Sequence, residues 1–214
     1  SVDVVYTAKE GSSLKDGKAV DVGSYTASYT FHGQTISKDF TIVKSEVVYY
    51  TDYTAPKATV TYGDVVSASD IGGTMRNSVT GDPVKGTFAW NNNPETYGDA
   101  QSTAKVFKAT FTPDDIDNYY GNNDVSVNVT VNKADKTDTA SCTINNRVGS
   151  TAELDLTSKL PEGASFGEAT VVFEGSIATA SVNDNKLSLE IIGSHAAADS
   201  FIVKVPVSNA TNYK

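Results

Sequence analysis

Oxygen-bearing side chains occur at short spacing between residues 114 and 118, where Asp114, Asp115, Asp117 and Asn118 stand close together. Carboxylate and amide oxygens at such spacing suit calcium, which takes six to eight oxygen ligands. A calcium loop also needs Gly at its sixth position and Glu at its twelfth, and this stretch has neither. Asp and Asn are equally common in turns, because their side chains hydrogen-bond the nearby backbone. We therefore interpret the stretch as a turn and predict neither a metal site nor a cofactor.

The single tryptophan, Trp90, stands at the end of a predicted strand and is followed by Asn91, Asn92 and, further along the loop, Tyr97. In one interpretation the indole ring stacks on a sugar and the Asn amides bond its hydroxyls, so that these four residues are the candidate ligand contacts. In the other, Trp90 anchors a core, because Phe88 and Trp90 share one face of the strand. We favour the core position for Trp90 and keep the four residues as candidate contacts.

Few residues of this chain are candidates for nucleophilic catalysis or for zinc binding. The lone cysteine, Cys142, alternates with Ala140 and Ile144, which predicts a small buried core residue. His32 and His195 fall in separate turn regions, whereas a zinc site needs three or four converging ligands. The sequence contains no G-x-S-x-G, H-E-x-x-H or phosphate-binding loop. We predict that the chain is not an enzyme.

Charge and composition exclude two classes of partner. The chain has 214 residues, a net charge of −9 and no cluster of Lys and Arg, so it lacks the basic stripe that nucleic-acid binding requires. No run of 18 apolar residues occurs, so no membrane insertion is predicted. The first residues show neither a basic nor an apolar signal region, so we expect no signal peptide. Acidity and near-absence of cysteine favour an exported bacterial protein.

Strict alternation of apolar and polar residues predicts an all-β fold. Between residues 102 and 133, Phe107, Ala109 and Phe111 share one face of a strand, and four valines from Val125 to Val131 share one face of the next. Further strands are predicted over Val2–Thr7, Ser24–Phe31, Ile36–Val43, Val47–Tyr53, Ala58–Tyr62, Lys85–Trp90, Thr139–Ile144, Ala152–Leu156, Ala169–Phe173, Ile177–Val182, Leu187–Ile191 and Phe201–Val207, with a short helical turn within Val65–Ile71.

Landmarks recur at the spacing of small domains. Asn118-Tyr119 and Asn212-Tyr213 lie 94 residues apart, and the candidate boundaries at Lys44 and Lys133 lie 89 apart. This spacing with an all-β pattern fits tandem Ig-like β-sandwich domains in an elongated array. We expect a partial or small β module over residues 1–45, a complete repeat over 46–134, and a repeat lacking its last strand over 135–214.

The middle region carries a resemblance to a known family. With Tyr62-Gly63-Asp64, the stretch Gly86–Tyr120 and the closing VNVTVNKAD (residues 127–135), it resembles the Ig-like and YGX-type tandem repeats of Gram-positive cell-surface proteins from gut Firmicutes. The stretch around DLTSKLPEGASFGEATVVF and the final VPVSNATNYK are similar to a second repeat type of such proteins. Because some relatives have been grouped with β-grasp folds, a β-grasp-like topology is the alternative for individual modules.

The resemblance implies a non-catalytic spacer, stalk or adhesive region at the surface or cell wall of a bacterium. Its partners would be a host glycoprotein, a glycan or another surface protein, and we expect a monomer. The alternative function is a carbohydrate- or glycoprotein-binding accessory module of a secreted glycan-active protein. Exposed aromatic rings would favour binding, and buried ones the spacer.

Overall fold

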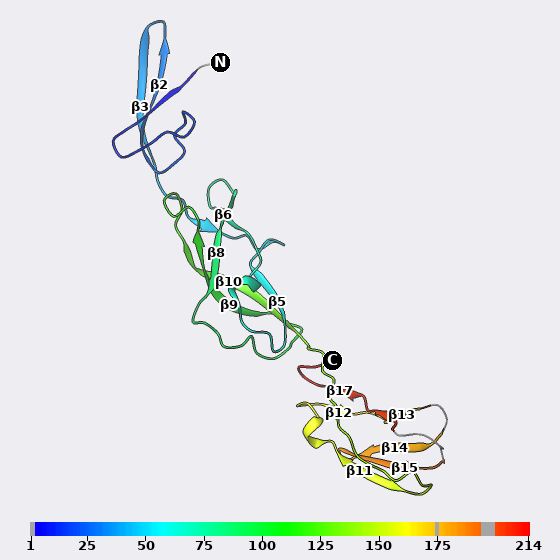
Figure 1. Cartoon of the computed structure of the whole chain (residues 1–214). Coiled ribbons are helices and arrows are strands. Elements are labelled where there is room, and N and C mark those ends of the chain that lie inside the picture. The colour runs from blue at the N-terminus through cyan, green and yellow to red at the C-terminus, as the bar shows by residue number, and fades with distance from the viewer. Residues whose placement is uncertain (1–2, 174–175, 194–199) are drawn as a thin grey trace. The chain divides into compact units, whose positions relative to one another are not determined.

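A computed structural model describes residues 3–173, 176–193 and 200–214 of the chain, and these are almost entirely β-strands and their connections (Figure 1). The all-β prediction is confirmed. The backbone divides into two compact units, the first formed by residues 1–59, 65–95 and 105–129 and the second by 60–64, 96–104 and 130–214. The described part contains no helix long and apolar enough to cross a membrane.

The first unit begins with an antiparallel sheet in the order β1 (Val5–Ala8), β2 (Gly23–Phe31) and β3 (Gln34–Ile42). His32 and Gly33 connect β2 to β3 with φ angles of 47° and 77°, the left-handed pair that a two-residue hairpin turn requires. Tyr25 is fully buried and stacks on Phe40. The far end of the hairpin is different, since Phe31 and Ile36 are 60% and 73% exposed.

The middle of the chain forms two sheets. One has the order β5 (Lys57–Thr61), β10 (Asn122–Asn132), β9 (Lys105–Pro113) and β8 (Gly86–Trp90), and we call it the middle sheet. The other has the order β4 (Val47–Val48), β6 (Met75–Asn77) and β7 (Pro83–Val84), and a 3-10 turn, η1 (Ala68–Asp70), lies between β5 and β6 in sequence.

β10 runs parallel to one of its neighbours and antiparallel to the other. The amide of Asn128 bonds the carbonyl of Pro56, and the amide of Tyr62 bonds that of Asn132. Because the residue numbers rise together, β5 and β10 run parallel, whereas β10 and β9 are antiparallel. The core follows the predicted alternation: Ala109, Phe111, Val125, Val127, Val129 and Val131 are all buried.

The second unit contains three further sheets: β11 (Thr151–Asp155), β15 (Lys186–Ile191) and β14 (Ala178–Asn183) in that order, β12 (Ser165–Phe166) with β17 (Val207–Ser208), and β13 (Thr170–Val172) with β16 (Ile202–Lys204). The turn η2 (Thr157–Lys159) follows β11. In Figure 1 β11, β14 and β15 lie side by side. Their buried core consists of Leu156, Ile177, Ala178, Leu187, Leu189 and Ile191.

Three predicted strands are wrong in extent or existence. Phe201–Val207 is not one strand, because β16 ends at Lys204 and β17 begins at Val207, and the two pair with different strands. Val47–Tyr53 is a strand only over Val47–Val48, because the chain bends at Thr51 and turns from Tyr53. The segment 139–144 forms no strand at all. Its alternation is local, but a strand also needs neighbours to pair with, and this segment has no main-chain partner among the described residues.

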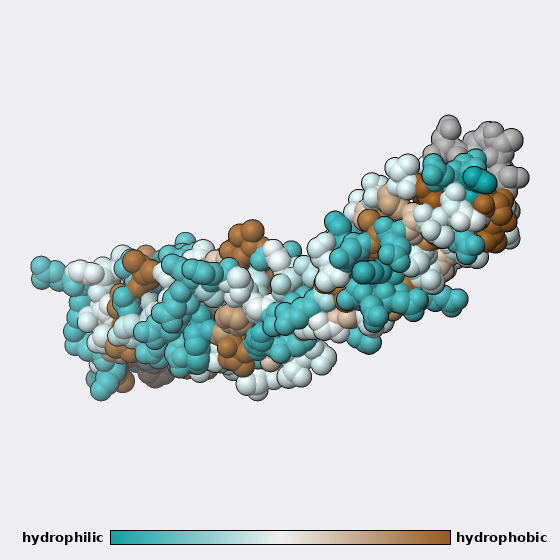
Figure 2. Space-filling model, turned by 90° about the horizontal axis from the view of Figure 1, so that it is seen from below, coloured by the Kyte–Doolittle hydropathy of each residue, from teal (hydrophilic) through white to brown (hydrophobic). Residues whose placement is uncertain are grey.

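Hydrophilic residues predominate on the face that Figure 2 draws, with hydrophobic residues in small separate groups. Exposed apolar side chains scattered in this manner are normal for a protein surface.

Candidate functional site

The first candidate site is a junction in the first unit, formed by Asp21, Lys44, Ser45, Asn118 and Tyr119, which we call clasp 1. Asn118 Oδ1 accepts the amide of Val22 at 2.7 Å, and its Nδ2 donates to Asp21 Oδ1 at 2.9 Å. Ser45 forms a parallel bridge with Tyr119: its amide donates to Asn118 O at 3.0 Å, and its carbonyl accepts from the Tyr120 amide at 2.9 Å. Clasp 1 thus ties the residues that follow β3 to the connection between β9 and β10.

The second unit contains the same arrangement, formed by Asp99, Lys133, Ala134, Asn212 and Tyr213, which we call clasp 2. Asn212 Oδ1 accepts the amide of Ala100 at 2.8 Å, and its Nδ2 donates to Asp99 Oδ1 at 3.0 Å. Ala134 bridges Tyr213 in parallel, donating to Asn212 O at 2.9 Å and accepting from the Lys214 amide at 3.0 Å. Clasp 2 ties the residues that follow β10 to those that follow β17.

A lysine and an aromatic ring complete each clasp. Lys44 Nζ donates to the carbonyl of Ile116 at 2.6 Å and lies 5.7 Å from the ring centre of Tyr120. In clasp 2, Lys133 Nζ donates to the carbonyl of Ala210 at 2.5 Å, and a different lysine, Lys136, lies 5.0 Å from the ring of Tyr213. Ammonium groups are attracted to the faces of such rings.

Asparagine suits this position because its amide is both an acceptor and a donor. It meets a backbone N–H and the preceding Asp carboxylate at once, and an Asp in its place could accept but not donate. In clasp 1 the Asp115 carboxylate also accepts from Asn118 Nδ2, at 2.8 Å. The clasps are therefore non-covalent and directional, and each joins backbone segments that are far apart in the sequence.

Sequence reasoning found part of these sites. It noted the repeated Asn-Tyr pairs and the repeated Lys boundaries but did not bring them together, and it missed Asp21 and Asp99. The sequence feature that could have identified them is that each Asp precedes a strand. The two aspartates lie 78 residues apart, one in each of the first two expected modules. The bonds join residues 96 and 112 positions apart, and single-sequence patterns hold no information at that range.

The predicted ligand contacts lie around the end of β8. Trp90 is only 8% exposed, its Nε1 donates to Ser67 O at 2.8 Å, and its ring packs edge-on against Phe107. Tyr97 is also buried. Asn91 bonds the backbone of Asn123 and the hydroxyl of Thr110, and Asn92 takes a left-handed turn conformation with φ 60°. Sugar stacking needs an open ring face, so this placement favours the core position, and ligand contact stays a prediction.

We expect Trp90 fluorescence to report this burial. The emission maximum should be shifted to the blue, and iodide should quench it far less than it quenches free tryptophan, because the ring lies between β9 and η1. A glycan and mucin panel should leave the emission unchanged. A red-shifted, readily quenched emission that responds to one sugar would contradict the core position.

The other residues that were considered for chemistry form no metal-binding cluster in the described ranges. No group of three or more His, Cys, Asp or Glu side chains there could hold a metal ion. Asp115 accepts from the Asn118 amide, as a turn carboxylate does. His32 is exposed in its turn, as predicted, while His195 lies outside the described residues. Cys142 is exposed. The prediction that it is a core residue is wrong, because its segment pairs with no sheet among the described residues.

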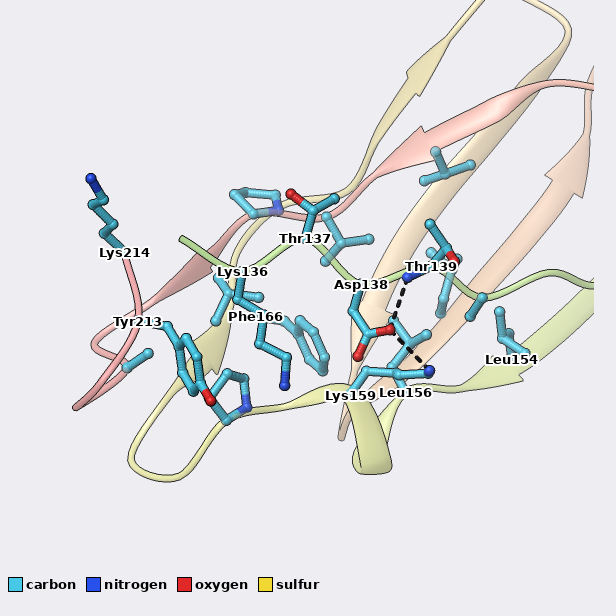
Figure 3. Close-up of a pocket in the computed structure, with 18 residues that line it drawn as sticks. Lys136, Thr137, Asp138, Thr139, Leu154, Leu156, Lys159, Phe166, Tyr213 and Lys214 are labelled. Atoms are coloured by element: carbon cyan, nitrogen blue, oxygen red, sulfur yellow. Dashed lines mark hydrogen bonds and ion pairs between the residues drawn. The ribbon is translucent and has the colours of Figure 1, made fainter. Parts of the chain in front are cut away.

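The second unit also holds a groove lined by both polar and apolar residues, which we call the β16 groove. It consists of two cavities of about 370 and 330 Å³ that share Ala140, Leu154, Leu187 and Val203. In Figure 3, Tyr213, Lys136 and Phe166 lie at one end of the first cavity, and Thr139 and Leu154 toward the other.

An ion pair stands at the rim of this groove. Lys159 Nζ donates to Asp138 Oδ1 at 3.1 Å (Figure 3). This hydrogen bond holds the pKa of Asp138 below its ordinary value, assisted by the Thr139 amide and opposed by partial desolvation.

An NMR titration should find the pKa of Asp138 below that of an unstructured Asp, about 3.9. Since the pKa is lower in the folded state, the pair stabilises the fold above pH of about 4, and this contribution is lost as pH falls through the folded pKa. Lys159→Met should return the pKa toward its ordinary value, whereas Lys186→Met should leave it unchanged. An ordinary pKa for Asp138 in the unaltered protein would contradict the ion pair.

No family model, curated protein or solved structure matches this chain. Its function is therefore argued from the two clasps and the sheets that they connect.

Proposed function

We propose that the chain is a non-catalytic spacer or stalk region of a bacterial cell-surface protein, built from tandem Ig-like β-sandwich repeats. The repeats would cover residues 1–45, 46–134 and 135–214. Sandwiches are favoured over a β-grasp arrangement because the middle of the chain has two sheets, and the only helical elements in the described ranges are short 3-10 turns.

One observation carries the proposal: the same clasp occurs twice, and it falls at both proposed boundaries. Ser45 and Ala134, the bridging residues, lie within the stretches at which the sequence pattern changes. Linkers between domains usually permit motion unless something holds them. Each clasp adds two side-chain bonds from one Asn, two main-chain bonds and a lysine contact to its linker. A spacer requires stiff junctions that repeat along the chain, whereas a binding module does not require them.

The net charge of the chain and its resemblance to surface-protein repeats support an extracellular location. A net charge of −9 keeps neighbouring copies soluble and mutually repelling. The resemblance of the middle region to YGX-type repeats of Gram-positive surface proteins supports an extracellular position on the cell wall.

The test is the stiffness of each junction with and without its Asn. In Asn118→Asp the Oδ1 acceptor is kept, but the donor becomes a carboxylate facing Asp21 and Asp115. Losing about two hydrogen bonds, at about 1 kcal/mol each, should lower the ratio of closed to open junction about 30-fold. Spin labels on Gln34→Cys and Val106→Cys, in a Cys142→Ser background, would report clasp 1 by electron–electron distance measurement. Labels on Ser102→Cys and Lys186→Cys would report clasp 2 in Asn212→Asp.

We expect narrow distance distributions in the parent protein and clearly broader ones in each Asp variant. Asn123→Asp is the matched control, because it makes the same charge change on an exposed residue of β10 outside the clasp. Its distribution should remain narrow. Unchanged widths in both clasp variants would reject the stiffened junction and, with it, the spacer function.

A further inference from the structure

Two segments in the middle of the chain run side by side in the same direction. We call residues 45–62, which contain β4 and β5, the entry segment, and residues 118–132, which end with β10, the exit segment. At clasp 1, Ser45 forms a parallel bridge with the exit segment. At the other end β5 lies beside β10, and the amide of Tyr62 donates to the carbonyl of Asn132 at 2.9 Å. Because the residue numbers rise together, the two segments are parallel.

Further hydrogen bonds join the segments between these two ends. Asn122 Nδ2 donates to the carbonyl of Val47 at 3.1 Å, and the amide of Asn128 donates to the carbonyl of Pro56 at 3.2 Å. Val47 and Pro56 are almost fully buried, so water does not readily replace these bonds when they break. The entry and exit segments are therefore held together at intervals along their length.

The parallel direction decides how tension acts on these bonds. Residues 1–44 join the entry segment at its clasp 1 end, and residues 133–214 continue from the opposite end of the exit segment. Tension along the chain therefore pulls the two segments lengthwise in opposite directions. The bonds between parallel strands are evenly spaced, so under this shear they carry the force together. Two segments pulled apart from the same end would instead lose their bonds one after another.

We propose that the entry and exit segments form a mechanical clamp that resists tension along the chain. The inference rests on the proposed spacer function and deepens it, because a stalk transmits to the cell wall any force that acts on the region it holds. Resistance to force is governed by the rate of unfolding rather than by the equilibrium stability. A clamp lowers that rate because several of its hydrogen bonds must break in the same transition state.

Single-molecule pulling of the intact chain compares the two directions of force. Handles on Val43→Cys and Thr137→Cys, in a Cys142→Ser background, pull the clamp in shear. Handles on Val65→Cys and Thr137→Cys pull from the end at which β5 and β10 both stop, so that the segments peel apart. The three handle residues are exposed. At one fixed force, the lifetime should be about 30-fold longer in shear, because about two more hydrogen bonds break together.

Asn122→Asp removes one bond of the clamp. The variant keeps the Oδ1 that accepts the Asp124 amide, but it loses the donor to the Val47 carbonyl. In shear, the unfolding rate at a fixed force should rise about fivefold, which corresponds to about 1 kcal/mol. In the peeling direction the rate should stay at that of the parent, because this bond lies far from the end that opens first.

Asn123→Asp is the matched control for this variant. It makes the same charge change on the neighbouring residue, whose side chain is exposed, so both unfolding rates should stay at those of the parent. A substitution that only weakened the fold would instead speed unfolding in both directions of force.

Two results would overturn the proposal. Equal lifetimes of the parent protein in the two directions would show that the paired segments do not share the force. An Asn122→Asp variant that speeds unfolding equally in both directions would show that its bond acts on the stability of the fold alone. The stiffness of the clasps is measured without force, by the distances between spin labels. A clamp that fails therefore leaves the stiffened junctions standing, and loose clasps leave the clamp standing.

Discussion

A Val127→Asp variant is expected to lose the folded middle sheet. Val127 is 0% exposed and lies at the centre of the four inward valines of β10, opposite Phe107. The substitution removes about 1.5–3 kcal/mol of apolar burial and places an unpaired carboxylate in the core. The combined cost should exceed about 4 kcal/mol, which is comparable to the whole stability of a small domain.

Chemical denaturation followed by Trp90 emission measures this loss locally, since Trp90 belongs to β8 of the same sheet. Val106→Asp is the matched control: it adds the same charge to the adjacent strand, where the side chain is 61% exposed. Its denaturation midpoint should stay close to that of the parent. Equal midpoints for all three proteins would show that β10 does not form the core of this sheet.

Gly86→Ala is expected to have the second-largest effect. A Cβ at residue 86 would lie 2.3 Å from the Thr112 carbonyl oxygen and 2.5 Å from Phe111 Cζ. The first contact is backbone and the second belongs to a buried ring, so neither can move away freely. Overpacking of this kind costs about 3 kcal/mol, which should lower the melting temperature of the middle sheet by more than about 10 °C.

Gly72→Ala is the control for this second prediction. Its Cβ would meet only the Lys57 carbonyl oxygen, at 3.8 Å, and its φ does not require glycine. The same substitution should therefore change stability by less than about 1 kcal/mol. Equal melting temperatures for the two alanine variants would contradict the close approach of β8 and β9 in this structure.

Local patterns predicted strands well where the strand pairs along its length with neighbouring strands of a sheet. The alternation in β9 and β10 identified both the elements and their buried faces, and the short turn within Val65–Ile71 is present as η1. Strands over Ser24–Phe31 and Ile36–Val43 were also predicted, with His32 in a turn region, and they form the hairpin of β2 and β3. Alternation defines which face of a strand is apolar, and this information lies in neighbouring residues.

The same patterns gave wrong predictions where pairing with a distant segment determines whether a strand forms and is buried. Ala140, Cys142 and Ile144 alternate as a strand would, but the segment has no ladder partner among the described residues, and Cys142 is exposed. In the first hairpin, Phe31 and Ile36 have the pattern of core residues and yet are largely exposed, because the described part of the chain places no sheet against that end. A pattern states which face could be buried, not whether anything covers it.

The sequence by itself determined that this chain is all-β, which residues of β9 and β10 face inward, and that Asn-Tyr pairs recur at domain spacing. Only the tertiary structure decided that each Asn meets an Asp and a backbone amide about a hundred residues away, that Trp90 is buried, and that β16 borders an open groove. The reason is the range of the interactions. Strand periodicity follows from the geometry of successive residues, whereas a clasp or a groove exists only once distant segments have been brought together.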